Sequence, residues 1–268
     1  MIKIAVVGAA GRMGKTIVAC IDDIKGVEVG GGTESQGNQA VGRDIGELAG
    51  LGKKNIAVSN QLSEVLKKCD VAIDFSSPES SMETLRTAGA LGKAVVLGTT
   101  GFSKAQMIEI RQTAWNMGCV LAPNMSIGVN VLFKVVRDMA KALGDDYDVE
   151  IVEAHHKFKK DAPSGTAVRI SEIVADALGR DLNEVGVYGR KGMSDGRGAK
   201  EIGIHALRAG DIVGEHRVLF GGMGESLEIF HKAQSRETFA RGAVRAASWI
   251  VKKPPGLYDM QDVLGLKD

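Results

Sequence analysis

Cysteines and long apolar runs are scarce in this sequence, and each scarcity argues against a class of protein. The three cysteines, Cys20, Cys69 and Cys119, form no C-x-x-C pair and have no metal-ligand spacing. Each lies in or beside an apolar segment, which is typical of small buried residues in a reducing compartment, so we expect neither disulfides nor a metal site. No run of about 18 apolar residues occurs, so we expect no membrane-spanning segment.

The sequence also lacks a strong charge imbalance. Its net charge is +1, so no strongly basic surface argues for a nucleic-acid partner and no acidic tail argues for a basic one. Residues 1–7 read as a strand that runs into a glycine-rich turn rather than as a signal peptide, and we expect a cytoplasmic protein. At 268 residues, with ordinary hydrophobic and charged fractions, we expect roughly two domains.

The first of these domains begins with a pattern that is typical of dinucleotide binding. An apolar strand over residues 2–7 leads into glycines spaced G-x-x-G-x-x-G, then an amphipathic helix, then a strand over residues 27–33. Gly8 would make the tight turn, Gly11 would let the backbone approach a pyrophosphate, and Gly14 would let helix and strand pack closely. Glu34 follows the second strand, where an acid can accept hydrogen bonds from ribose hydroxyls. The alternative is an ordinary turn between a strand and a helix.

Later strands in this half end in small or polar residues. We predict strands near residues 56–58 and over residues 71–75, 94–97 and 119–121, a short helix within residues 40–51, and helices from residue 78 and over 104–115. Ligands of open parallel sheets bind at the carboxyl ends of the strands. The candidates to line the nicotinamide half of a site are therefore residues 74–76, Gly98, Thr99, Thr100, Ala122, Pro123, Asn124 and Met125.

The pattern changes near Ser126, where we place the start of a second domain. A long apolar helix over residues 129–143 precedes a strand over 149–154, a helix over 164–178 and a polar, glycine-rich loop over 179–200. Three strand-like runs follow, near residues 202–208, 213–220 and 226–231, and their short connections predict antiparallel pairing in a mixed sheet. A final helix over 238–251 is predicted to return to the first domain. The fold class is thus α/β: a Rossmann-like dinucleotide-binding domain over 1–126, with 237–268 packed on it, and an α+β domain over 127–236.

A charged stretch at the end of the strand near residue 154 is the candidate for substrate chemistry. His155, His156 and Lys159 supply charge-assisted donors, and Lys159, beside other cations, is a candidate proton donor. Ser164-Gly165-Thr166 begins a helix whose backbone N–H groups can hold a carboxylate. The alternative is a solvated charged loop. His205, His216 and His231 lie on strand-like runs and are more typical of packed or interfacial residues.

This stretch, E-x-H-H-x-x-K-x-D-A-P-S-G-T-A, resembles the signature of the dihydrodipicolinate reductase family, also called 4-hydroxy-tetrahydrodipicolinate reductases, of bacterial and plant lysine biosynthesis. The resemblance extends over the chain. It includes the glycine loop over 7–14, residues 74–76, 98–101 and 122–124, and the two C-terminal segments over 208–216 and 231–236.

The resemblance implies a reaction and a role for each matching residue. The family reduces a cyclic imine dicarboxylate with NADH or NADPH in lysine and diaminopimelate biosynthesis: hydride goes to a ring carbon and a proton completes the product. His155 and Lys159 are implied as the catalytic pair. The substrate-binding residues implied are His156, Lys159, Ser164, Gly165, Thr166 and Arg236. The cofactor-binding residues implied are Gly8, Ala9, Ala10, Gly11, Arg12, Met13, Glu34, Gly98, Thr99, Thr100, Ala122, Pro123, Asn124 and Met125. A homotetramer built through the mixed sheets is implied as well.

Two departures from the family pattern bear on the cofactor. Met125 stands where the family often has phenylalanine. Glu34 is followed by Ser35, whereas members suited to a 2′-phosphate have arginine after the acid, so we expect NADH to be used at least as well as NADPH. Two other readings are another nicotinamide oxidoreductase, such as a semialdehyde dehydrogenase with a catalytic cysteine, and a non-enzymatic dinucleotide sensor. The sensor reading leaves the histidines and lysine of the charged stretch without a use.

Overall fold

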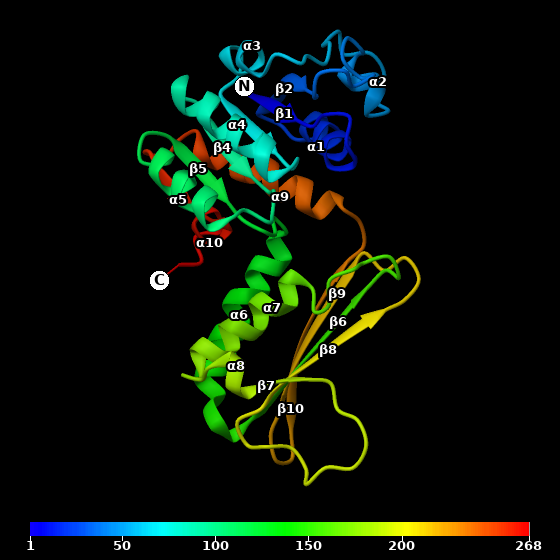
Figure 1. The fold of residues 1–268 in the computed structure, drawn as a ribbon, viewed down its shortest axis with the longest axis vertical. Helices are drawn as coiled ribbons and strands as arrows, with labels where there is room; N and C mark the ends of the chain where they lie inside the picture. Colours follow the sequence, from blue (N-terminus) through cyan, green and yellow to red (C-terminus); the bar gives the residue numbers. More distant parts are fainter. Residues whose placement is uncertain (268) are drawn as a thin grey trace. The chain divides into compact units, whose positions relative to one another are not determined.

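The computed structural model describes residues 1–267 and divides the chain into two compact units. The first unit consists of residues 1–127 together with the C-terminal segment from Arg236, and the second of residues 128–235. The two units are described separately below, and Figure 1 labels their helices and strands. No helix in residues 1–267 is both long and apolar enough to cross a membrane.

The first unit is built on a six-stranded parallel sheet in the order β11-β5-β4-β3-β1-β2. Helices cover both faces of the sheet: α1 and α9 contribute to one buried cluster, and α3, α4 and α5 to the other. Strands buried on both faces consist of nearly continuous apolar residues, which is why these segments were predictable from the sequence. The strands are β1 (Ile2–Val7), β2 (Val27–Thr33), β3 (Val71–Asp74), β4 (Ala94–Leu97), β5 (Gly118–Leu121) and β11 (Gly256–Tyr258). The helices are α1 (Arg12–Asp23), α2 (Ile45–Leu48), α3 (Leu62–Lys67), α4 (Pro78–Ala90), α5 (Lys104–Thr113), α9 (Glu237–Ile250) and α10 (Met260–Leu264).

The C-terminal segment completes this unit. Helix α9 packs against α1, and β11 pairs in parallel with β5 at the sheet edge. Gly242 of α9 lies against the backbone of the β5–α6 connection, where a Cβ atom would come within 1.8 Å of the Met125 carbonyl oxygen. Only glycine permits this approach, so Gly242 is the residue through which the backbone of α9 packs against the β5–α6 connection.

One of two predictions between β2 and β3 was wrong. The short helix predicted within residues 40–51 is the four-residue α2, whereas the strand predicted near residues 56–58 is reduced to isolated bridges. The Asp44 side chain explains both outcomes, because it caps α2 and also accepts hydrogen bonds from the backbone N–H groups of Lys54 and Ile56. Those N–H groups are therefore bonded to a side chain instead of to a neighbouring strand.

The second unit is a five-stranded mixed sheet in the order β10-β9-β6-β8-β7. Its buried cluster joins one face of the sheet to the helices α6 and α7, with apolar residues alternating along β6 and β9. The strands are β6 (Asp148–His155), β7 (Gly186–Tyr188), β8 (Ile202–Arg208), β9 (Gly214–Gly221) and β10 (Ser226–Ala233). The helices are α6 (Ile127–Leu143), the short 3₁₀ helix η1 (Gly144–Asp146), α7 (Gly165–Ala177) and α8 (Leu182–Val185).

The order of these strands corrects part of the prediction. Strands β9 and β10 are antiparallel as expected, but β6 lies between β8 and β9 and pairs in parallel with β8. The chain after β8 hydrogen-bonds to the end of β6, with the Ala209 N–H donating to the carbonyl of His155, and so crosses to the other side of β6. The loop predicted over residues 179–200 also contains α8 and the edge strand β7.

Candidate active site

The glycine loop between β1 and α1 has the backbone geometry that a dinucleotide requires. Gly8 has a φ of +70°, in the left-handed region that favours glycine. A Cβ atom at Gly14 would lie 2.1 Å from the Gly8 carbonyl oxygen, and one at Gly11 would lie 3.1 Å from it. The loop leads into the twelve-residue helix α1, which starts at Arg12 and has no side-chain cap on its first N–H groups. These groups remain available for a pyrophosphate, so the residues fit the predicted cofactor.

Glu34, at the end of β2, is positioned next to this loop. Its Oε1 accepts a hydrogen bond of 2.8 Å from the Ala10 N–H, and its Oε2 accepts one of 2.9 Å from the Asn38 side chain. A carboxylate in this position can accept hydrogen bonds from ribose hydroxyls and repels a phosphate.

The loops that follow β3 and β4 are held by side chains of α4. Ser81 donates a hydrogen bond of 2.8 Å to Thr99, and Thr84 donates one of 2.6 Å to the fully buried Asp74. Gly98 is needed where it stands, because a Cβ atom there would lie 2.3 Å from the ring of Phe75. Of the residues predicted to line the nicotinamide side, Thr99 is therefore engaged with α4, while Thr100 is exposed.

The segment after β5 offers a cofactor its backbone more than its side chains. Ala122 and Met125 are buried in the core of the first unit, whereas Pro123 is exposed. The Asn124 side chain accepts a hydrogen bond of 2.9 Å from the Ser126 N–H, which fixes the turn into α6. Met125, which replaces the phenylalanine frequent in the family, is thus a core residue.

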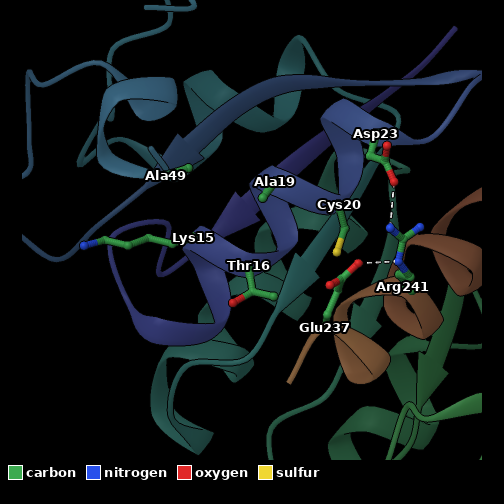
Figure 2. Close-up of a pocket in the computed structure, with 8 residues that line it drawn as sticks. All are labelled: Lys15, Thr16, Ala19, Cys20, Asp23, Ala49, Glu237 and Arg241. Carbon is green, nitrogen blue, oxygen red and sulfur yellow. Dashed lines mark hydrogen bonds and ion pairs between the residues drawn. The ribbon is translucent and has the colours of Figure 1, made fainter. Parts of the chain in front are cut away.

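A pocket of about 380 Å³ lies between α1 and α9 (Figure 2), but it shares no residue with the predicted cofactor site. Arg241 of α9 crosses it with two hydrogen bonds of 2.6 Å, to Asp23 of α1 and to Glu237. These charges tie the C-terminal helix to α1. The lining residues are Lys15, Thr16, Ala19, Cys20, Asp23, Ala49, Glu237 and Arg241.

In the second unit, His155 ends β6 and lies beside a buried carboxylate. The side chain of Glu153 is fully buried, and its Oε2 lies 2.6 Å from Nδ1 of His155, which is itself 9% exposed. Burial by itself raises the pKa of Glu153, but hydrogen bonds from Arg208, His155 and the Ser164 N–H outweigh it and lower the pKa. The carboxylate is therefore ionised and can only accept, so Nδ1 of His155 carries a proton and Nε2 is the site that gains or loses one.

Lys159 lies in the loop that follows His155. Its ammonium group is 2.9 Å from the carboxylate of Asp161, and its side chain is 23% exposed. The neighbouring His156 ring packs near Phe158, with 6.3 Å between ring centroids. The Ala162–Pro163 peptide bond that ends this loop is cis. A lysine and a histidine with different partners are thus both held at the end of β6.

Helix α7 begins directly after this loop, as predicted. Ser164 is its N-cap and accepts a hydrogen bond from the Ala167 N–H. Gly165 is exposed and Thr166 half-buried, so the start of a thirteen-residue helix faces outward at these residues. His216 of β9 lies behind Ser164, with its Nε2 atom 3.1 Å from the serine hydroxyl. Burial and the neighbouring charges of His155 and His231 lower the pKa of His216 to about 3, so this ring is neutral.

The predicted site residues are not all in one unit. His155, His156, Lys159, Ser164, Gly165 and Thr166 lie together in the second unit. Arg236 belongs to the first unit, where it precedes α9, rather than to the domain in which the sequence analysis placed it. Sequence reasoning missed Arg208 as a partner of this cluster and left open whether Glu153 orients the histidines or only balances their charge.

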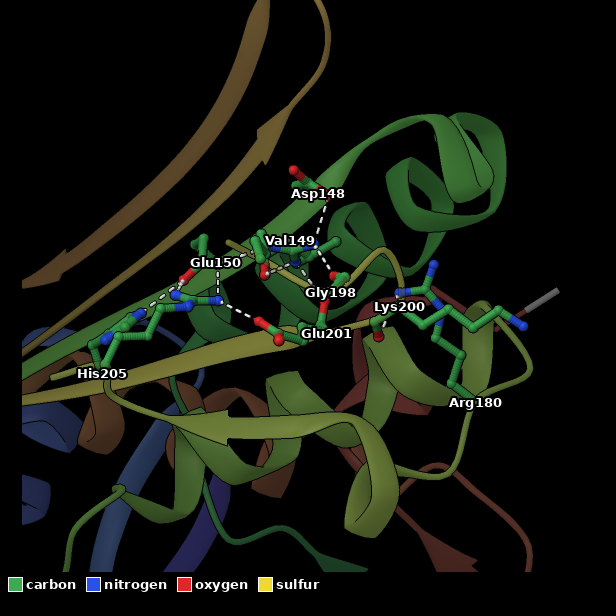
Figure 3. Close-up of polar contacts among 10 residues, drawn as sticks. Asp148, Val149, Glu150, Arg180, Gly198, Lys200, Glu201 and His205 are labelled. Carbon is green, nitrogen blue, oxygen red and sulfur yellow. Dashed lines mark hydrogen bonds and ion pairs between the residues drawn. The ribbon is translucent and has the colours of Figure 1, made fainter. Parts of the chain in front are cut away.

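Two other groups of side chains are not suited to chemistry of this kind. All three cysteines are buried, and burial raises the thiol pKa to about 11 for Cys20 and Cys69 and to about 12 for Cys119. None of them can act as the nucleophile of a semialdehyde dehydrogenase. His205 binds Glu150 in a separate charged network (Figure 3). Within residues 1–267, no group of three or more histidine, cysteine or acidic side chains could hold a metal ion.

Comparison with known proteins identifies the family. Residues 2–125 match the family model of the dihydrodipicolinate reductase N-terminus, and residues 128–264 match that of its C-terminus. The chain belongs to the dihydrodipicolinate reductase family. The 4-hydroxy-tetrahydrodipicolinate reductase of Syntrophus aciditrophicus (strain SB) is 53% identical over 267 residues, and that of Hahella chejuensis (strain KCTC 2396) is 55% identical, with 100% of each chain covered.

Solved structures show the same fold. A dihydrodipicolinate reductase from Paenisporosarcina sp. TG-14, with dipicolinate bound, aligns with a TM-score of 0.78 at 24% identity and covers 98% of both chains. An amine dehydrogenase from Mycobacterium smegmatis aligns with a TM-score of 0.58 at 18% identity, over 96% of this chain and 94% of its own. The predicted family, fold class and reductase activity are thereby confirmed, and membership of this family implies the use of NAD(P)H.

Proposed function

We propose that this chain catalyses the reaction for which its relatives are named, the NAD(P)H-dependent reduction of 4-hydroxy-tetrahydrodipicolinate to tetrahydrodipicolinate in lysine and diaminopimelate biosynthesis. The observation that carries the proposal is the cluster at the end of β6. There a histidine fixed by a buried carboxylate, a lysine and the start of helix α7 lie together in a chain whose other unit has a dinucleotide loop.

The residues of the second unit bind the substrate carboxylates and transfer the proton. The backbone N–H groups of Gly165 and Thr166, the Ser164 hydroxyl and the His156 ring bind the two carboxylates of the substrate, because a helix start favours anions. Lys159 donates the proton, and His155, with Nδ1 bound to Glu153, exchanges a proton at Nε2. Arg236 assists in holding a carboxylate.

The first unit binds the cofactor. Residues 8–13 hold the pyrophosphate against the start of α1, Glu34 accepts from the adenosine ribose, and the segments 98–100 and 122–125 line the nicotinamide. When bound, NAD(P)H supplies the hydride. NADH is used at least as well as NADPH, because the Glu34 carboxylate, held beside the glycine loop by the Ala10 N–H, would repel a 2′-phosphate and Ser35 offers no cation.

Turnover of a freshly prepared substrate tests this function. Oxidation of NADH or NADPH is followed in the presence of the condensation product of pyruvate and aspartate semialdehyde, and the wild-type chain is expected to turn over. The double variant His155→Ala with Lys159→Ala is expected to lose at least about 100-fold in kcat, since general acid–base groups contribute roughly 10²–10⁴. Lys157→Ala, whose ammonium lies over the ring of Phe158, is the matched control and should keep its activity.

Two results would contradict different parts of the proposal. An inactive wild-type chain would remove the function itself. Activity retained in the double variant would leave the function but remove the assigned proton-transfer residues.

A further inference from the structure

We propose that Arg208 is a positioning residue for proton transfer, because its guanidinium holds both the carboxylate that orients His155 and the loop that carries Lys159. The inference rests on the proposed function, in which these two side chains move the proton. Arg208 ends β8, and the parallel pairing of β8 with β6 places it directly beside His155.

The first contact of Arg208 is with Glu153. Its Nη1 donates to Oε2 and its Nη2 to Oε1, both at 2.8 Å, which is the two-pronged geometry of a strong arginine–carboxylate pair. The same Oε2 accepts from Nδ1 of His155 at 2.6 Å, and Oε1 accepts from the Ser164 N–H at 2.9 Å. One fixed carboxylate therefore sets the tautomer of His155 and anchors the first residue before α7.

The second contact of Arg208 is with the loop between β6 and α7. Its Nη2 donates a hydrogen bond of 2.5 Å to the backbone carbonyl of Asp161. The Asp161 side chain in turn holds the ammonium of Lys159 at 2.9 Å. The lysine is thus tied to the same guanidinium as the histidine, through one intervening residue in each case.

Only arginine can make this set of contacts. A guanidinium has five N–H donors in a rigid plane and can bridge both carboxylate oxygens and a carbonyl at once. A lysine at this position would keep the positive charge but would present a single ammonium, so Glu153 and the Asp161 carbonyl would compete for it. The two properties of Arg208, charge and geometry, can therefore be separated by substitution.

Glu153 and Arg208 carry opposite charges, so the loss of each should shift the pKa of His155 in the opposite direction. Burial lowers the pKa of His155, the Glu153 carboxylate raises it, and the Lys159 and Arg208 cations lower it, with a lowered pKa as the net result. The other titratable groups near the ring are His216 of β9, 5.3 Å away between centroids, with His231 of β10 beyond it. Loss of the Arg208 charge should raise the pKa of His155, whereas loss of the Glu153 charge should lower it.

Titration of the His155 ring by NMR in the full-length, substrate-free protein tests this arrangement, with the signal assigned by its loss in His155→Gln. Arg208→Gln is expected to raise the His155 pKa and Glu153→Gln to lower it. Arg208→Lys should leave it nearly unchanged but reduce kcat by about 10- to 100-fold, with the KM for NADH preserved, since loss of an outer hydrogen-bond partner typically has this effect. Arg169→Gln, which removes an exposed arginine of α7 paired with Glu172, is the control and should change neither quantity.

A role for Arg208 through its charge alone would leave kcat unchanged in Arg208→Lys, because lysine keeps the positive charge. Shifts in the same direction in Arg208→Gln and Glu153→Gln, or full kcat in Arg208→Lys, would overturn the proposal. If Arg208→Gln does not fold, Arg208→Lys still separates geometry from charge through its kcat and its unshifted titration. The titration needs no substrate, so its outcome is independent of whether the proposed reaction is correct.

Discussion

Glu34 is a single carboxylate whose contacts determine the cofactor preference that we expect. It is held by the Ala10 N–H and by Asn38, so it cannot easily turn away from a phosphate at the ribose 2′ position. We predict that kcat/KM with NADH equals or exceeds that with NADPH. The double variant Glu34→Gln with Ser35→Arg removes the negative charge and supplies a cation. It should shift the ratio of the two kcat/KM values toward NADPH by about tenfold or more, because like-charge contacts cost several kcal/mol.

Initial rates with both cofactors at several concentrations measure this ratio. Glu64→Gln, which neutralises an exposed carboxylate on α3 that is paired with Lys67, serves as the control and should leave the ratio unchanged. A large preference of the wild-type chain for NADPH would show that other cations of the chain, such as Arg12 or Lys15, overcome the Glu34 charge.

Among individual residues, the sequence predicts the side chains that carry chemistry better than the side chains that hold them in place. His155, Lys159 and Ser164 stand within one short stretch, so their proximity follows from the chain itself. Arg208 is 55 residues from Glu153, and they meet only because β8 pairs with β6. His216 reaches Ser164 in the same way, from 52 residues away through the neighbouring strand β9. Contacts of this kind depend on strand order, which the sequence did not establish.

The loop between β7 and β8 shows how one half-buried acid can hold a segment without regular structure. Glu150 of β6 accepts hydrogen bonds from Arg190, Arg197 and His205, and Arg190 and Arg197 also bind Glu201 (Figure 3). Burial alone raises the pKa of Glu150, but hydrogen bonds from Arg190, His205 and Arg197 outweigh it and lower the pKa to about 2. Residues 189–201 are thereby attached to β6, the central strand of the sheet.

This attachment predicts an acid-sensitive loop. Because the folded pKa of Glu150 is below its unfolded value of about 4.3, its stabilising contribution is present above pH ~4.3 and is lost as the pH falls through about 2. Hydrogen exchange within residues 189–201 should therefore rise between these pH values, after correction for the intrinsic rate. Glu150→Gln should show faster exchange and faster proteolysis of the loop already at pH 7. Glu172→Gln, which removes an exposed acid of α7, should not, and equal cleavage of both variants would contradict the prediction.

The elements that the sequence failed to predict are the short ones. Strand β7 has three residues and α8 has four, too few to show a period of either kind, and both lie in a polar, glycine-rich segment. Helix α9 was recognisable because its fourteen residues alternate between buried and exposed faces. The number of residues in an element, rather than its position in the chain, therefore decided whether the sequence could predict it.

At the scale of the whole molecule, the sheet of the second unit carries exposed apolar side chains on the face opposite its buried cluster. Helices α6 and α7 bury the face that carries Ile151, Ile204 and Val218. Alternation along the strands places Leu207 of β8 and Phe230 of β10 on the opposite face, where they are 53% and 49% exposed, and Arg217 lies over the Phe230 ring. Large apolar side chains exposed on a sheet are typical of a contact surface, and we propose that copies of this chain associate through this face into a homotetramer.

Light scattering coupled to size-exclusion chromatography measures this assembly directly. We predict a mass of four times 28.3 kDa for the wild-type chain. Leu207→Glu with Phe230→Glu should lower the mass, because each copy would bring two new carboxylates into an apolar contact. Trp115→Glu, a substitution at an 81% exposed aromatic residue of the first unit, should leave the tetramer intact. A wild-type mass of a single chain would contradict the tetramer, and an unchanged mass in the double variant would place its interface elsewhere.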